Sequence, residues 1–194
     1  MPSPASGPSL PPGRETINSS EGLAGELEPS SGAVPEGYLI RRATRDDLPE
    51  VIRLNRENLP ENYSEDFFED VLESNPDSFL VAEGDGGRLV GYIMCRVEVG
   101  FPLVGRSPIT RKGHVISIAV DPGHRRRGLG TALMTEGMRA LRARGCSEVY
   151  LEVRVSNEPA ISLYRRLGFR PVRRIPGYYR DGEDAFVMAR SLRP

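Results

Sequence analysis

The sequence predicts an α/β fold: one mixed sheet with helices on both faces and the element order βααβββαβαββ. Three observations lead to it. Short segments rich in β-branched residues alternate with segments whose apolar residues recur at helical spacing. The hairpin signature EGDGGR at 83–88 joins two consecutive strands, so part of the sheet is antiparallel. Between 114 and 155 a strand, a helix and another strand follow one another, which predicts a crossover connection.

The first half of the domain carries a strand, two helices and a hairpin. A short strand, YLIRR, begins at Tyr38. Thr44-x-x-Asp47 resembles a capping arrangement for an amphipathic helix that runs from Leu48 to the break at Leu59-Pro60. Ser64 caps a second helix, which Asn75-Pro76 ends. Strands at 79–82 and 89–97 follow, and a loop with two prolines spans 100–110.

The second half is organised around the stretch from His114 to Thr131. A β-branched strand at 114–120 ends in the turn residues 121–123, and a helix with its apolar face runs from Thr131 to Gly145. A strand at 148–155 then places its valines and Leu151 on one face and Glu152 on the other. A helix from 158 to 167 and strands at 169–174 and 185–192 complete the chain.

Composition divides the chain into a tail, residues 1–36, and a domain, residues 37–194. The tail has no aromatic residue, is rich in Pro, Ser and Gly, and carries one arginine against five glutamates, so we expect it to be disordered and acidic. An inert extension and a docking peptide are both open interpretations. The net charge of −1 for the whole chain leaves a small positive excess on the domain, which does not indicate nucleic-acid binding.

Targeting, membrane and metal signals are missing from the sequence. No apolar run approaches the ~18 residues of a membrane span, and no signal-peptide pattern opens the chain. We therefore expect a soluble, cytoplasmic protein without a membrane partner. The two cysteines, Cys95 and Cys146, have no CxxC spacing, so we predict buried thiols and no metal.

The turn between 120 and 131 has the features of an anion site. Three arginines, Arg125, Arg126 and Arg127, precede Gly128 and Gly130 at the start of the helix. Free backbone amides at a helix N-terminus attract anions, and glycines let a phosphate approach the backbone. Neither GxxxxGK[ST] nor a dinucleotide fingerprint is present.

Arg125-x-x-Gly128-x-Gly130 resembles the acetyl-CoA pyrophosphate loop of the GNAT N-acetyltransferase superfamily. Within it, the sequence is similar to the archaeal and eukaryotic N-terminal α-amino acetyltransferase catalytic subunits, which are related to the ribosomal-protein alanine acetyltransferases. Five ordered segments carry this resemblance, which covers nearly all of 38–192: LPENY (59–63), GHVISIAV (113–120), YLEVRVSN (150–157), LYRRLGF (163–169) and GYYRDGEDA (177–185).

The resemblance implies a GNAT fold with splayed central strands and acetyl-CoA as co-substrate. Backbone amides of the central strand would face the pantetheine and the acetyl oxygen, the loop after it would bind pyrophosphate, and the next strand and helix would contact CoA. The implied cofactor residues are Ile118, Ala119, Val120, Arg125, Arg126, Arg127, Gly128, Leu129, Gly130, Thr131, Asn157 and Tyr164.

The resemblance also implies the catalytic and substrate residues. His114 would take a proton through an ordered water, because an imidazole titrates near neutrality, with Glu152 as a second proton-transfer group. Tyr164 would protonate the departing thiolate, and Glu61 would hold the substrate's amine. The implied substrate residues are Leu59, Pro60, Glu61, Tyr63, Tyr178 and Tyr179.

The predicted function is acetylation of protein N-termini by direct attack in a ternary complex, with Ser, Ala or Thr as first residue and Met left open. A lysine or small-amine acetyltransferase and a non-catalytic acyl-CoA-binding module are the alternatives. We expect a monomer or weak dimer, and a ribosome or an auxiliary subunit remains open as a partner.

Overall fold

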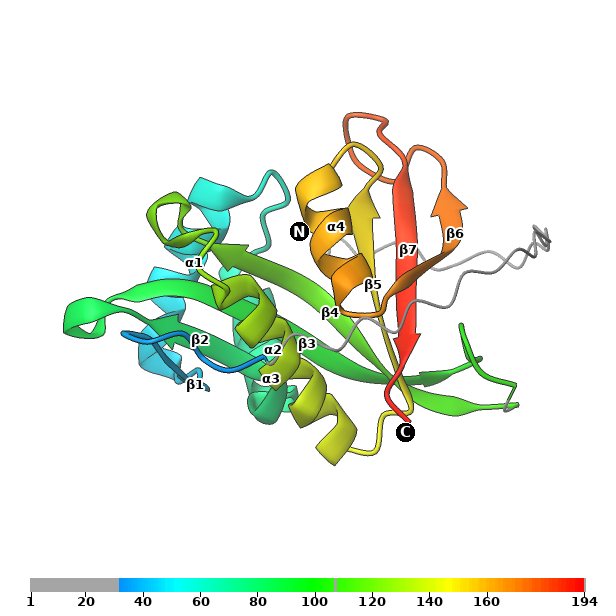
Figure 1. Ribbon diagram of the computed structural model, residues 1–194, viewed down its shortest axis with the longest axis horizontal. Helices are drawn as coiled ribbons and strands as arrows, with labels where there is room; N and C mark the ends of the chain where they lie inside the picture. Colours follow the sequence, from blue (N-terminus) through cyan, green and yellow to red (C-terminus); the bar gives the residue numbers. More distant parts are fainter. Residues whose placement is uncertain (1–31, 107, 194) are drawn as a thin grey trace.

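A computed structural model describes residues 32–106 and 108–193. These residues form a mixed sheet of seven strands with helices packed against it (Figure 1). The strand order across the sheet is β1-β2-β3-β4-β5-β7-β6. The strands are β1 (Leu39–Arg42), β2 (Phe79–Glu83), β3 (Leu89–Gly100), β4 (Thr110–Val120), β5 (Glu148–Arg154), β6 (Arg170–Ile175) and β7 (Ala185–Ser191). The α-helices are α1 (Leu48–Asn58), α2 (Glu65–Ser74), α3 (Leu129–Ala143) and α4 (Glu158–Arg166). The predicted element order and fold class are confirmed.

The sheet pairs antiparallel everywhere except between β4 and β5. That one parallel pair is the crossover through α3, and the last strand, β7, lies between β5 and β6. β5 therefore lies inside the sheet, with β4 on one side and β7 on the other.

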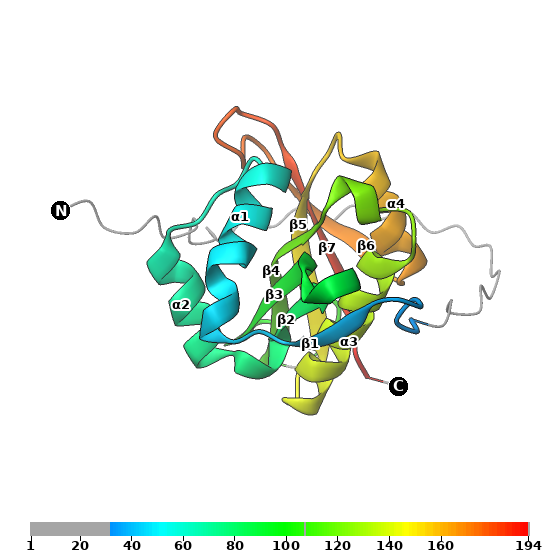
Figure 2. The same ribbon diagram turned by 90° about the vertical axis from the view of Figure 1, so that its left-hand side faces the viewer.

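Helices cover both faces of the sheet, as predicted. Figure 2 shows α1 and α2 on one side and α3 and α4 on the other. The side with α3 and α4 holds the larger core cluster, which includes the buried Leu133, Leu141 and Leu151. The other side holds Phe68, Tyr92 and their neighbours. The predicted caps are present, because Ser64 accepts from the amide of Phe67 and Asp47 from that of Thr44.

The central strands contain a bulge and then separate. The register between β3 and β4 shifts so that Met94 faces Ser117 while Cys95 faces Val115, which leaves Ile116 as the extra residue. β4 pairs with β5 only from Lys112 to His114. Beyond that point the two strands diverge, as Figure 1 shows. The C-terminal half of β4 consequently has one edge that no neighbouring strand occupies within the described residues.

Two boundaries differ from the prediction. β4 begins at Thr110, because Thr110–Gly113 extend the hairpin with β3 as far as Gly100, so His114 lies in the middle of the strand and not at its start. Of the predicted tail, residues 32–36 contain no helix or strand, and residues 1–31 lie outside the described part. In the described residues no helix has the length and apolar character to cross a membrane.

Candidate active site

His114 lies between two carboxylates from two neighbouring strands. Its Nε2 is 2.6 Å from Oε2 of Glu152 on β5, and its Nδ1 is 3.4 Å from Oε1 of Glu98 on β3. The imidazole also stacks on the ring of Tyr150, with ring centroids 4.4 Å apart and planes 3° apart. The sheet brings these groups together because His114 is the last β4 residue paired with β5, opposite Tyr150. The two predicted proton-transfer residues, His114 and Glu152, are therefore in direct contact.

The two carboxylates set the electrostatics of the cluster. Burial lowers the pKa of His114, but the hydrogen bonds with Glu152 and Glu98 outweigh burial and the net pKa is raised. Burial likewise raises the pKa of Glu98, and its hydrogen bonds with His114 and Tyr150 reverse this, so that the pKa falls well below its usual range. Both effects favour the charged forms.

A buried polar network supports the bulge from behind. Tyr92 shares a 2.6 Å hydrogen bond with Ser117, the residue after the bulge, and accepts one of 3.0 Å from Asn55 of α1. Asn55 also donates to the carbonyl of Glu61 at 3.2 Å, and Tyr63 donates to the carbonyl of Ile116 at 3.3 Å. The loop between α1 and α2 is thereby tied to the bulge, which explains how LPENY reaches the site.

Arg154, at the end of β5, joins the two loops that flank the site. Its guanidinium lies 2.6 Å from Glu61 on the α1–α2 loop, and 2.7 and 2.8 Å from Asp181 and Glu183 on the β6–β7 loop. It also lies over the ring of Tyr179, 4.0 Å from the centroid. Three carboxylates around one cation leave the mouth of the site net negative. Glu61 is thus held in an ion pair, an arrangement that the sequence did not indicate.

Tyr63, Tyr178 and Tyr179 gather around the same mouth. Burial raises the pKa of Tyr178 to about 12, with Glu152 and Glu61 adding to the effect. The pKa values of Tyr63 and Tyr179 are raised for the same reasons, burial first. Tyr178 and Tyr179 are in edge-to-face contact, with ring centroids 5.0 Å apart. Their hydroxyls remain protonated donors at neutral pH, beside partly buried Leu59 and exposed Pro60.

The Arg- and Gly-rich loop has the backbone of an anion site. Arg126 and Gly128 both have positive φ, at 63° and 85°, and Gly128 precedes α3 without a side-chain cap. Left-handed residues here turn successive amides toward one side, and the helix N-terminus adds a partial positive charge. The binding of a pyrophosphate by the amides from Arg126 to Thr131 therefore stays a prediction that this backbone is consistent with.

The side chains of that loop are mostly engaged with the protein. The guanidinium of Arg125 donates to the carbonyl of Val120 at 2.8 Å and to Asn58 at 2.8 Å. Arg127 donates to the hydroxyl of Tyr38 at 3.3 Å, which is also 2.9 Å from Nδ1 of His124. These contacts connect Arg125 to β4 and α1, and its expected contact with the cofactor stays a prediction.

Asn157 and Tyr164 occupy the helix that follows β5. Asn157 caps α4 by accepting from the amide of Ala160 at 3.3 Å. Tyr164 is buried and packs near Phe169, and burial raises the pKa of its hydroxyl to about 12. Both residues lie on the β5 side of the separated strands, while Ile118, Ala119 and Val120 lie on β4 across the gap.

Residue-by-residue interpretation missed several members of this site. Glu98, Tyr150, Arg154 and the buried pair Tyr92 and Asn55 all contact predicted site residues. The signal for Glu98 was its position in an otherwise apolar strand, CRVEVG, where alternation aligns Arg96 and Glu98 on one face. No local pattern identifies Asn55, because a helix asparagine is ordinarily exposed.

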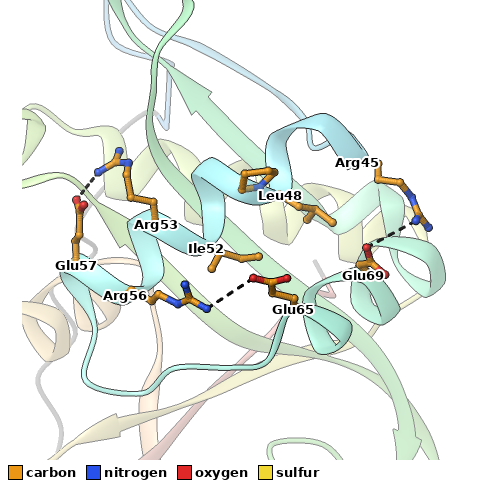
Figure 3. Close-up of a pocket in the computed structure, with 9 residues that line it drawn as sticks. Arg45, Leu48, Ile52, Arg53, Arg56, Glu57, Glu65 and Glu69 are labelled. Atoms are coloured by element: carbon orange, nitrogen blue, oxygen red, sulfur yellow. Dashed lines mark hydrogen bonds and ion pairs between the residues drawn. The ribbon is translucent and has the colours of Figure 1, made fainter.

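A separate hollow of about 520 Å³ lies between α1 and α2 (Figure 3). Apolar residues of α1, including Leu48 and Ile52, form its floor, and arginines and glutamates surround it. Figure 3 shows these charges paired with one another, Arg53 with Glu57 and Arg56 with Glu65. None of the predicted catalytic residues lines this hollow.

The cysteines lie in the core of the domain. Cys95 and Cys146 are both buried in the core against α3, as predicted. Among the residues described, no group of three or more His, Cys, Asp or Glu side chains is arranged to hold a metal ion.

Comparison with known proteins gives the family. Residues 48–169 match the acetyltransferase (GNAT) family. The N-alpha-acetyltransferase of Sulfurisphaera tokodaii is 50% identical over 157 residues, which cover 80% of this chain and 93% of the relative. The crystal structure of Ard1 from Thermoplasma volcanium has a TM-score of 0.71 at 29% identity, covering 81% of this chain and 99% of that one. The NatB acetyltransferase complex bound to CoA and MES contains a chain with a TM-score of 0.68 at 27% identity, covering 80% and 99%. The chain therefore belongs to the acetyltransferase (GNAT) family, alongside the archaeal N-alpha-acetyltransferases.

Proposed function

We propose that this acetyltransferase transfers the acetyl group of acetyl-CoA to the free α-amine of protein N-termini. The observation that carries the proposal is the mouth of the site, where Glu61, Arg154 and Tyr179 join the two flanking loops beside the His114–Glu152 pair. Its surplus of carboxylates suits an ammonium group, and its tyrosine hydroxyls suit the backbone of a peptide. The similarity to N-alpha-acetyltransferases supports the same reaction.

The separation of β4 from β5 supports acetyl-CoA binding between these two strands. Amides of Arg126 to Thr131 would hold its pyrophosphate, and Asn157 and Tyr164 would flank its pantetheine arm. The unpaired edge of β4 from Ile118 to Val120 would donate to the acetyl oxygen as negative charge develops there. A structure of the NatB relative contains CoA, which supports this co-substrate.

The reaction is a direct attack. The amine nitrogen forms a bond to the thioester carbonyl carbon, the carbon–sulfur bond breaks, and the thiolate takes a proton from the hydroxyl of Tyr164. Both cysteines are buried in the core, and burial raises the pKa of each thiol, which disfavours the thiolate that an acetyl-cysteine intermediate would need. Removal of the amine's proton falls to the His114–Glu152 pair.

The cost of deprotonation favours an α-amine over a lysine side chain as the acceptor of the acetyl group. At pH 7 an α-amine with a pKa of about 7.7 costs roughly 1 kcal/mol to deprotonate, whereas a lysine with a pKa of about 10.4 costs roughly 4.6 kcal/mol. One carboxylate–imidazole pair suffices for the first. The two loops that Arg154 joins also suit the end of a chain better than a side chain in its middle. We propose Ser, Ala or Thr as the first residue, with Met as the alternative that the same mouth would accept.

The test is steady-state acetylation, followed by CoA release, of three peptides: one beginning with Ser, one beginning with Met-Leu, and one N-blocked with an internal lysine. We expect turnover of a free terminus and none of the blocked peptide. Turnover of the blocked peptide alone would replace the proposal with lysine acetylation. Acetyl-CoA binding without any turnover would favour a binding module or a requirement for an auxiliary subunit. Glu152→Gln should abolish the activity, and Glu158→Gln, an exposed carboxylate on α4, serves as the matched control.

A further inference from the structure

A carboxylate oxygen lies near each nitrogen of the His114 imidazole, and Nδ1 also lies 3.5 Å from Nη2 of Arg96. Glu152 lies 2.6 Å from Nε2 and Glu98 lies 3.4 Å from Nδ1. A neutral imidazole has only one N–H, whereas an imidazolium donates from both nitrogens. The side chain of His114 is 12% exposed, so few water molecules can replace either partner.

Glu98 is held in place by donors besides His114. The hydroxyl of Tyr150 donates to its Oε2 at 2.6 Å, and Nε of Arg96 donates to its Oε1 at 2.8 Å. The same Tyr150 ring stacks against the imidazole. Glu98 therefore cannot move away from His114 without losing these two contacts, and both contacts favour its ionised form.

The charges that face His114 nearly balance only if it is protonated. Glu98 and Glu152 contribute two negative charges and Arg96, whose Nη2 lies 3.5 Å from Nδ1, contributes one positive charge. Lys112 lies on the Tyr150 ring, 5.2 Å from its centroid. On the substrate side, the charge of Glu152 helps to raise the pKa values of Tyr63 and Tyr178, so both phenols are protonated and neutral. Glu98, Glu152 and Arg96 together carry a net charge of about −1, and a protonated imidazole would bring the sum to zero.

We propose that Glu98 is a positioning residue that keeps His114 as an imidazolium, so that Glu152, and not the imidazole, receives the proton of the substrate's amine. The inference rests on the proposed acetylation of an α-amine. The ammonium N–H bond breaks, the proton passes to Glu152, and the nitrogen lone pair attacks the thioester. This proton leaves Glu152 for solvent. As the carbon–sulfur bond breaks, the nitrogen loses its second proton to Glu152, and that proton returns through solvent to Tyr164, whose own proton the thiolate has taken. The second oxygen of Glu152, Oε1, has no hydrogen-bond partner among the described residues and can face the amine.

The two possible bases, Glu152 and neutral His114, predict opposite effects of losing Glu98 on the activity. If the imidazolium is required, losing Glu98 lowers the pKa of His114 and the enzyme loses activity at the alkaline side of its pH profile. If the neutral imidazole is required, the same substitution raises activity at the acidic side. Comparing both enzymes with the same peptide at each pH cancels the ionisation of the peptide's own amine.

The experiment combines NMR titration and kinetics of Glu98→Gln. The chain has two histidines, so a His124→Gln background leaves a single imidazole to follow by ¹⁵N chemical shifts of both ring nitrogens. We expect both nitrogens to be protonated at pH 7, and the midpoint to fall by about one pH unit or more in Glu98→Gln, as expected on losing an opposite charge within 4–6 Å. The alkaline limb of kcat/KM should move by the same amount.

Two controls accompany the experiment. Tyr150→Phe keeps the stacked ring and the Glu98 charge, so the midpoint of His114 should move by less than in Glu98→Gln. Glu136 lies on α3 and pairs with Arg139, so Glu136→Gln should change neither the titration midpoint of His114 nor the pH profile of kcat/KM. Retention of the amide NMR spectrum shows that each variant is folded.

A neutral imidazole at pH 7 in the wild-type chain, with Nδ1 accepting from Arg96, would overturn the proposal. So would a gain of kcat/KM at pH 6 in Glu98→Gln. Absence of peptide turnover by the wild-type chain would count against the proposed function alone, because the NMR titration does not depend on turnover.

Discussion

Asp47 offers a quantitative test of how this fold is held together. Its carboxylate is 9% exposed and accepts two hydrogen bonds from Arg41, of 2.7 and 2.8 Å, and one of 2.7 Å from the amide of Thr44. The bonds from Arg41 lower the pKa of Asp47 from 3.8 to about 2, although burial opposes them. Each pKa unit corresponds to about 1.36 kcal/mol, so ionised Asp47 contributes about 2.4 kcal/mol to the free energy of unfolding at pH 7.

The sign of the pH dependence follows from the lowered pKa. The contribution is complete above the unfolded-state pKa of 3.8 and disappears as the pH falls through about 2. We expect Asp47→Asn to lose about 2.4 kcal/mol at pH 7 and only about 1.3 kcal/mol at pH 3, relative to the unchanged chain at each pH. Asp46→Asn, at the exposed neighbouring position, is the matched control and should change stability by less than about 0.5 kcal/mol.

Urea denaturation followed by circular dichroism at pH 7, 5, 4 and 3 measures these differences. A loss for Asp47→Asn that stays constant over this range would refute the reasoning, because it would show that the ionised carboxylate is not what stabilises the fold. A loss in Asp46→Asn of the same size would show that the effect is not specific to the pair with Arg41.

Three further predictions concern contacts that only the structure reveals. Glu148→Gln should lower the free energy of unfolding by about 1–3 kcal/mol, since its buried carboxylate accepts from two amides of the β3–β4 loop at 2.7 and 3.1 Å; urea denaturation measures the change, and none would mean that those amides find other acceptors. Tyr92→Phe should cost about 1–3 kcal/mol by leaving Ser117 and Asn55 without their buried partner; thermal unfolding unchanged within error would contradict this. Arg154→Met removes the cation that three carboxylates share. It should raise the KM for peptide about tenfold, or about 1.4 kcal/mol, and leave the KM for acetyl-CoA unchanged. Equal effects on both KM values would argue for a general loss of structure.

Much of the fold could be predicted because its signals are local. Hydrophobic period, caps such as Ser64, and turn residues such as Gly145 and Gly168 depend on neighbours a few positions away. These signals predicted the order of the four α-helices and seven β-strands of the described residues. The anion loop was also local, since its glycines, its arginines and the helix that follows it are contiguous in the chain. The extension of β4 to Thr110 was missed because only its pairing with β3 makes those residues a strand.

The candidate site was predicted in part, for the same physical reason. Resemblance placed His114 and Glu152 together, and the two are in contact at 2.6 Å. It did not reveal Glu98 as the second carboxylate on His114, nor the ion pair of Glu61 with Arg154, which are 93 positions apart. Contacts of this kind depend on strand order and register, which no local pattern encodes.

The sequence alone thus determined the element order, the Gly-rich turn before α3 and the family resemblance, because each is encoded by residues close together in the chain. The tertiary structure decided which charges meet: the bulge at Ile116, the separation of β4 from β5, and the position of β7 beside β5 bring carboxylates from distant segments onto His114 and Arg154. Charge pairing depends on the distance between groups in space, so only the packed sheet determines which charged side chains meet.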